Sequence, residues 1–224
     1  MKPLVQFIQE KLIIKKSKYN YFPQTKEELR NIIEQRMKKE GNEANLNDIS
    51  TSSITDMSFL FYKLNFNGDI SKWDVSNVKT MSNMFLECKS FNQDLSNWDV
   101  SNVKDMSYMF YWCESFNQDI SNWDVSSVKF MSNMFAGCKT FNQDISKWNV
   151  SNVKYMNRMF YRCEAFNQDI SAWDVSNVTA MNNMFGDCKT FNQDLSKWNI
   201  SNVNNYFNMF AGCPIEEKYK PKFK

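Results

Sequence analysis

The sequence predicts an α/β solenoid: a right-handed stack of about seven strand-turn-helix coils with a helical cap at its N-terminal end. The first observation is that the six cysteines recur every 25 residues, a repeat period rather than the spacing of a disulfide framework or a zinc site. The second is that large apolar residues share this period. The third is a helix-start signature before the repeats. The cysteines are Cys88, Cys113, Cys138, Cys163, Cys188 and Cys213.

One repeat, residues 91–115, shows how each coil is expected to fold. Trp98 and Val100 alternate with polar residues, which suits a short strand. The apolar residues from Val103 to Cys113 follow at offsets of 0, 3, 6, 7 and 10, the spacing of one helical face. The apolar columns should form the core. They start at Phe66, Trp73, Met84 and Phe85 and continue every 25 residues.

The first coil begins before the first cysteine. Leu46, Ile49 and Ile54 repeat the apolar spacing of the later coils, and Leu64 takes the cysteine position in a coil that is one residue short. The chain therefore divides into four predicted segments. These are an N-terminal arm or targeting helix (1–17), a helical cap (18–45), the solenoid (46–213) and a basic C-terminal tail (214–224).

The cap and the tail should close the two ends differently. Thr25 and Glu28 form a capping-box signature, and Gly41 supplies a stop, so we expect a helix over residues 26–40. This helix would cover the exposed edge of the first coil, which otherwise invites aggregation. Pro214 ends the last coil, and the lysine-rich tail after it is expected to be mobile.

Composition excludes several classes of function. The chain has no histidine, which removes the commonest general base and metal ligand. Only 5 glycines occur, and no phosphate-binding glycine motif is present. A net charge of +2 is not that of a nucleic-acid-binding protein, and no apolar run is long enough to span a membrane. We therefore expect a protein that is not an enzyme and uses no cofactor.

The repeat resembles the BspA-like family of leucine-rich repeats, found in bacterial surface proteins, mycoplasma lipoproteins and some phage proteins. The shared motif is F-N-Q-D-I/L-S-x-W-D/N-V/I-S-x-V-x-x-M-x-x-M-F-x-x-C. It covers about three quarters of the chain and departs from the pattern at Gly68 and Tyr206. The resemblance implies a leucine-rich-repeat-like fold, and many of its members are exported adhesins. No signal peptide or lipobox is seen here, which favours a cytoplasmic or phage-particle location. The motif is nearly unbroken from Phe91, Phe116, Phe141 and Phe166.

Two polar or reactive columns have a structural and a chemical interpretation. The cysteines are buried reduced thiols, because Leu64 in the same column shows that the position takes a hydrophobic residue; the alternative is a metal or redox array. The aspartates at Asp69 and every 25 residues after it cap backbone N–H groups, or else hold calcium. The second column that starts at Asp74 has Asn149 and Asn199 in place of aspartate, which favours capping over a metal row.

Positions that vary between coils indicate a partner-binding face. Nothing in the scaffold is expected to require a tryptophan at position 112. A few other variable positions also carry Trp, Tyr or Arg, the residue types enriched at binding hot spots. The alternative to a binding face is that these are exposed aromatic residues scattered by chance. Asn133, Ala136 and Gly137 should form a low saddle between two clusters of such residues. The candidate partner-binding residues are Tyr108, Tyr111, Trp112, Phe130, Tyr155, Arg158, Tyr161 and Arg162.

The N-terminal arm supports a second hypothesis. It resembles the short head-targeting peptides of internal proteins of T4-like phages, which implies processing after Ile8-Gln9-Glu10, at Glu10; the alternative is an ordinary amphipathic helix. The favoured function is a non-catalytic interaction module that binds a protein or another macromolecule. The alternatives are a phage-particle structural or cargo protein, and a cell-surface adhesin exported by an unrecognised route.

Overall fold

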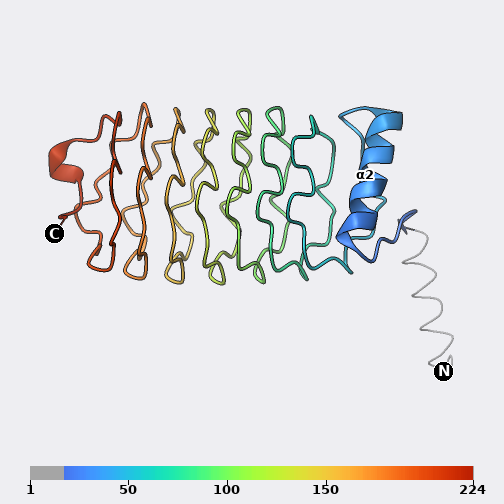
Figure 1. The fold of residues 1–224 in the computed structure, drawn as a ribbon, viewed down its shortest axis with the longest axis horizontal. Helices are drawn as coiled ribbons and strands as arrows, with labels where there is room; N and C mark the ends of the chain where they lie inside the picture. The colour runs from blue at the N-terminus through green and yellow to red at the C-terminus, as the bar shows by residue number, and fades with distance from the viewer. Residues whose placement is uncertain (1–17, 224) are drawn as a thin grey trace, which may run out of the picture.

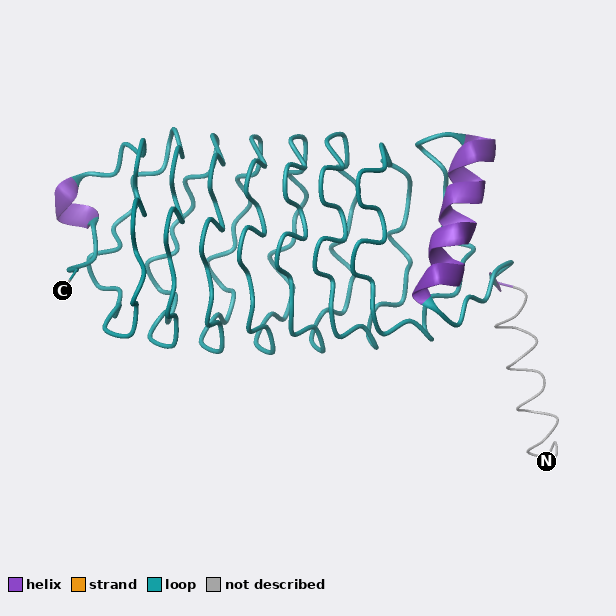
Figure 2. Ribbon diagram, in the orientation of Figure 1, coloured by secondary structure: helices purple, strands orange, loops and turns teal. Residues whose placement is uncertain are grey.

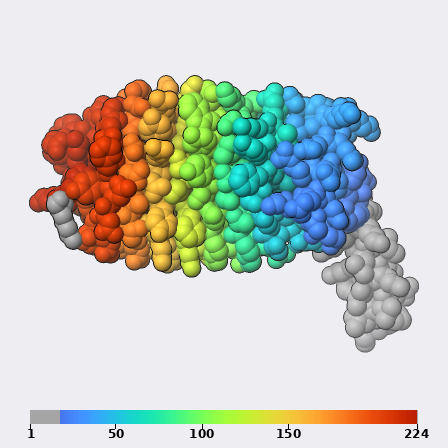
Figure 3. Space-filling model, viewed as in Figure 1, coloured from blue at the N-terminus to red at the C-terminus, as the bar shows by residue number. Residues whose placement is uncertain are grey.

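The computed structural model describes residues 18–223. Helix α2 (Lys26–Glu40) lies at one end of a long regular stack of coils, and the short 3-10 helix η1 (Glu217–Tyr219) lies at the other end (Figure 1). The space-filling view shows the coils as successive bands along the molecule (Figure 3). The repeat stack predicted from the 25-residue period is therefore present.

Helix α2 forms where the capping signals placed it. The Thr25 hydroxyl accepts the N–H of Glu28 at 3.1 Å, and the Glu28 carboxylate accepts the N–H of Gln24 at 2.7 Å. The helix ends at Gly41, whose φ of 85° suits glycine and whose N–H donates to the carbonyl of Met37. The prediction for residues 26–40 is confirmed. Leu29 and Ile33 are buried, so this face of α2 packs on the stack.

The coils contain neither strands nor helices within residues 18–223, which corrects the strand-turn-helix prediction (Figure 2). Trp98 does not enter a strand because its N–H closes a turn on the carbonyl of Leu95 at 3.1 Å and is unavailable for pairing. Coils are joined instead by isolated parallel bridges between neighbours. These link Asp56, Thr80, Asp105, Phe130, Tyr155, Ala180 and Asn205 in succession.

The segment from Val103 to Cys113 is a run of turns. A helix fails there because Tyr108 and Trp112 have φ angles of 58° and 56°, in the left-handed region that a right-handed helix excludes. Alternate N–H groups then point along the stack: those of Tyr108 and Phe110 donate at 2.9 Å to carbonyls of the next coil. The N–H groups between them close turns within their own coil. Hydrogen bonds that a helix would make within one coil thus hold successive coils together.

Stacked aromatic rings fill the core at the predicted 25-residue period. The ring of Phe110 lies 5.5 Å from that of Phe85 and 5.7 Å from that of Phe135, centroid to centroid, and nearly parallel to both. Phe116 packs against Phe110 at 4.0 Å. All of these side chains are fully buried, so each coil depends on its neighbours for its core.

The cysteine column is a column of free thiols, five of them buried. The thiol of Cys113 donates to the carbonyl of Phe85 at 3.0 Å, and the same bond recurs along the column. Burial raises the pKa of Cys88 to about 12 and the pKa of the deeper thiols well above the usual value of 9.0. Cys213, in the last coil, differs because it is only partly buried. The column packs as hydrophobic side chains with an internal hydrogen bond.

Both aspartate columns cap backbone N–H groups. Asp94 accepts the N–H of Ser96 at 2.8 Å, and the equivalent bond is present in the other repeats. Asn149 accepts the N–H of Ser151 at 3.2 Å in the second column, which explains why asparagine replaces aspartate there: only the acceptor oxygen is used. Within residues 18–223 no cluster of three or more cysteine and acidic side chains is arranged to hold a metal ion.

The C-terminal tail packs on the last coil, which corrects the expectation that it is mobile. Ile215 is 6% exposed and Pro221 is buried. The carbonyl of Tyr219 accepts the N–H of Leu195 at 2.8 Å, and Phe223 stacks on Tyr206 at 4.5 Å. The tail therefore covers part of the C-terminal end of the stack as far as residue 223.

Candidate partner-binding face

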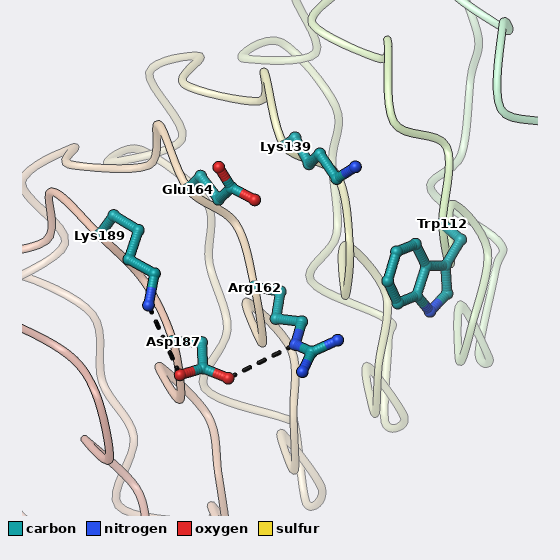
Figure 4. Close-up of a pocket in the computed structure, with 6 residues that line it drawn as sticks. All are labelled: Trp112, Lys139, Arg162, Glu164, Asp187 and Lys189. Atoms are coloured by element: carbon teal, nitrogen blue, oxygen red, sulfur yellow. Dashed lines mark hydrogen bonds and ion pairs between the residues drawn. The ribbon is translucent and has the colours of Figure 1, made fainter.

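The variable positions of the central coils border a hollow of about 440 Å³ on the side of the stack (Figure 4). Its wall holds one aromatic side chain, three cations and two carboxylates, contributed by four successive coils. Two of these residues, Trp112 and Arg162, are among the predicted partner-binding residues. The lining residues are Trp112, Lys139, Arg162, Glu164, Asp187 and Lys189.

Trp112 is held in place by the glycine of the next coil. A β-carbon on Gly137 would lie 2.8 Å from Cδ2 of the indole, and the φ of 79° at Gly137 also favours glycine. The indole therefore packs over the backbone of the neighbouring coil and is partly buried. The sequence predicts that nothing in the scaffold requires a tryptophan at this position, and that stays a prediction; the packing on Gly137 shows that the side chain is nonetheless in contact with the scaffold.

Tyr161 repeats this arrangement two coils further on. A β-carbon on Gly186 would lie 3.0 Å from the ring of Tyr161. The guanidinium groups of Arg158 and Arg162 lie 5.9 Å and 5.2 Å from the ring centroid, within range of a cation–π contact. A bulky side chain followed by glycine in the next coil thus fixes both predicted aromatic anchors.

Ion pairs within and between coils organise the charged part of the hollow. Lys139 donates to Glu114 at 2.5 Å, and this bond lowers the pKa of the Glu114 carboxyl. Asp187 is flanked by Arg162 at 3.4 Å and Lys189 at 3.6 Å. The contacts of Asp187 are solvent-exposed and each stabilises the fold little, while the Lys139–Glu114 bond is partly buried. Their effect is to position charges around Trp112.

Comparison with known proteins gives a family assignment. A family model described as "Mycoplasma protein of unknown function, DUF285" matches twice, at residues 28–135 and 116–221. The chain belongs to the DUF285 family. The two matches overlap and together span most of α2, the coils and η1. Searches of curated proteins and of solved structures returned no match.

The remaining predicted residues of the DUF285 chain lie in two further groups. Tyr108 packs against Tyr111 at 5.5 Å, and Tyr111 meets the edge of Trp112 at 6.3 Å, so this cluster adjoins the hollow. Phe130 and Tyr155 stack at 5.7 Å on the column of bridges and do not line the hollow. Trp112 and Arg162 thus line the hollow, Tyr111 and Tyr161 pack beside them, and the Phe130–Tyr155 pair lies apart from it.

Sequence reasoning missed four lining residues of the hollow. Lys139, Glu164 and Lys189 belong to a column in which charge alternates along the stack, and Asp187 follows Arg162 one coil later. The alternation was visible in the sequence: the column reads Lys89, Glu114, Lys139, Glu164 and Lys189. Comparing opposite charges at the repeat period would have found it.

Two other predictions concern features beyond this face. Glu10, the predicted processing position, lies outside the described residues. Among residues 18–223 the structure has no helix of the length and apolarity needed to cross a bilayer.

Proposed function

We propose that this DUF285 chain is a non-catalytic protein-interaction module that binds a protein partner through the hollow beside Trp112. The observation that carries the proposal is backbone conformation. Trp112 and Arg162 have positive φ angles, where an L-amino acid with a bulky side chain costs about 1–2 kcal/mol. The equivalent positions hold Gly137 and Gly212 in two other coils, which adopt this conformation without that cost, and charged residues (Lys63, Glu87 and Asp187) in the remaining three.

A second column of positions with positive φ angles, which includes Tyr108, Asn133 and Arg158, supports the same argument. Four of its positions are asparagine, which tolerates this conformation, whereas Tyr108 and Arg158 adopt it with φ angles of 58° and 55°. Phe59, Lys63 and Glu87 adopt the same conformation in the first two coils, so strain occurs along the whole stack. What is particular to the central coils is that Trp, Tyr and Arg, the usual hot-spot residues, occupy these positions at or beside one hollow.

The chemistry of the hollow suits a protein partner. A partly buried tryptophan held over a glycine loses little side-chain freedom on binding, and Trp, Tyr and Arg are the usual hot-spot residues. The surrounding charges alternate in sign, which selects partners whose charges complement them. We expect a partner segment with an apolar side chain against Trp112 and charged side chains on both sides.

We also propose a finer classification of the fold of the stack. The 25-residue motif and the aromatic columns support placing the stack with BspA-like leucine-rich repeats as a right-handed solenoid. A binding role is the general use of such extended stacked surfaces. Burial raises the pKa of the core thiols and the aspartates cap turns, so both groups have structural roles that do not require catalysis.

The test is capture of partners by immobilised full-length protein. Trp112→Ala and Arg162→Ala should each reduce the amount of a specifically retained protein by at least about fivefold, the effect of losing about 1 kcal/mol. The matched control is Phe59→Ala, since Phe59 is an exposed aromatic residue with a positive φ angle in the first coil. Equal retention by all three variants and the parent protein, measured by quantitative mass spectrometry, would contradict the proposal.

A further inference from the structure

The C-terminal end of the stack presents a row of backbone hydrogen-bond donors. In the earlier coils the N–H groups at these positions donate to carbonyls of the next coil. The last coil has no successor, and within residues 18–223 no acceptor is bonded to the N–H groups of Asn208, Phe210 and Gly212. These three groups alternate along the run of turns, as the bonded ones do.

Within residues 18–223, the carbonyls of this segment accept hydrogen bonds, except that of Gly212. Those of Phe207 and Met209 accept N–H groups of the preceding coil, and that of Asn208 closes a turn with Ala211. The same holds for every carbonyl from Asn205 to Ala211. A β-strand edge alternates open donors with open acceptors, whereas the open backbone groups of this segment are N–H donors as far as Ala211.

A hollow of about 350 Å³ lies beside this row. It is lined by Asn208 and Phe210 of the row, by other residues of the last coil, and by Lys220 and Phe223 of the tail. The one carboxylate among the lining residues, that of Glu217, is paired with Lys220. Phe207 in the same segment is 71% exposed. Donor groups and exposed aromatic surface thus occupy one end of the molecule.

The opposite end shows how the fold closes the complementary edge. The first coil presents carbonyls in this column, and α2 lies over them. Arg30 of α2 donates to the carbonyls of Phe59 and Leu60 at 2.7 Å and 2.8 Å, and Lys26 pairs with Asp56. An edge of acceptors is therefore met by a helix that carries cations.

A second copy of the chain does not fit the donor row. Two C-terminal ends would bring donors against donors, and the acceptor edge of another copy is covered by α2. The occupant must bring acceptors of its own, as carboxylates do.

We propose that the C-terminal end binds a segment of a partner protein that carries Asp or Glu side chains beside apolar ones. Its carboxylates accept from the N–H groups of Asn208, Phe210 and Gly212, and its apolar side chains cover Phe207. Charged acceptors make the stronger hydrogen bonds to backbone N–H groups. This site is separate from the hollow at Trp112 and does not depend on it.

Amide chemical shifts of the full-length protein test the proposal. The probes are two short blocked peptides of equal length that alternate leucine with glutamate or with glutamine. The glutamate peptide should shift the amide signals of Asn208, Phe210 and Gly212 saturably, and the glutamine peptide should bind at least about tenfold more weakly. The amides of Asn183, Phe185 and Asp187, already bonded to the last coil, should not move and serve as internal controls.

A substitution distinguishes binding of the glutamate peptide at this site from its nonspecific electrostatic attraction to lysine side chains. Phe207→Ala should weaken binding of the glutamate peptide severalfold without changing the unfolding midpoint, because Phe207 is exposed. Equal shifts with both peptides, or shifts at the control amides alone, would overturn the proposal. So would unchanged binding to the Phe207→Ala variant.

Discussion

Raising the pH above 9.0 should unfold the stack. Burial raises the pKa values of five buried thiols from 9.0, to about 12 at Cys88 and well above 9.0 at the other four. In the unfolded chain the same thiols ionise near 9.0, so the unfolded state loses protons first and stability falls as pH rises. The loss is about 1.4 kcal/mol for each thiol per pH unit, or about 7 kcal/mol for five by about pH 10. That is comparable with the whole stability of an ordinary domain.

Urea unfolding followed by circular dichroism under reducing conditions measures this effect. Well below the unfolded-state pKa of 9.0 the contribution of the thiols is fully present, so the midpoint should be constant there and then fall steeply. The control is a variant with Cys113→Ala and Cys138→Ala, whose stability should fall with pH about two fifths less steeply. An alkaline loss of the same size in this variant would assign the effect to other groups.

Removing the N-terminal cap should cause the protein to assemble into head-to-tail chains. A protein that begins at Asn45 lacks α2 and exposes the carbonyl edge of the first coil. That edge complements the donor row of the last coil in another copy, and a contact that does not close on itself propagates as a filament. Sedimentation velocity should show a concentration-dependent series of linear oligomers.

A single substitution in the contact between α2 and the first coil should destabilise the protein less than removal of the whole helix. Arg30→Ala in the full-length protein leaves the Leu60 carbonyl without its donor and should cost about 1–3 kcal/mol of unfolding free energy. The matched control is Asn31→Ala, which alters an exposed position of the same helix and should leave the urea midpoint nearly unchanged. If the protein that begins at Asn45 stayed monomeric with an unchanged unfolding midpoint, α2 would not be a cap.

The features of the fold that depend on side-chain chemistry at the repeat period were predictable from the sequence. Stacked Phe and Trp rings, buried thiols and capping aspartates follow from identical residues every 25 positions. Helix α2 followed from Thr25, Glu28 and Gly41. Each of these features is either local in the sequence or repeated at a fixed period, so it can be inferred without the path of the backbone.

The path of the backbone within a coil was not predictable in the same way. Apolar offsets from Val103 to Cys113 fit a helix as well as the run of turns that is present. The difference lies in the φ angles at Tyr108 and Trp112 and in N–H groups that bond to the next coil. Neither residue type favours that conformation, so these two positions carry no sign of it, although Asn133 and Gly137 in the next coil do.

The candidate site was predicted in part for a related reason. Its aromatic and arginine residues stand out from the repeat, whereas Lys139, Glu164 and Lys189 belong to a column whose alternating charges resemble an ordinary solvated surface. The support of Trp112 by Gly137 depends on neighbouring coils, so it appears only when the columns are compared in pairs.

Replacing residues of two coils by those at the equivalent positions of a third tests most directly whether the positions that bind the partner are separate from those that build the scaffold. Both clusters are given the residues of the coil between them, Asn133, Ala136 and Gly137. The substitutions are Tyr108→Asn, Tyr111→Ala, Trp112→Gly, Arg158→Asn, Tyr161→Ala and Arg162→Gly. The measurement compares partner retention with the urea midpoint of the same variant. We predict that retention is lost while the midpoint changes little, because relief of four strained φ angles offsets the packing that Trp112 and Tyr161 lose. Retained binding with a markedly lower midpoint would contradict the account.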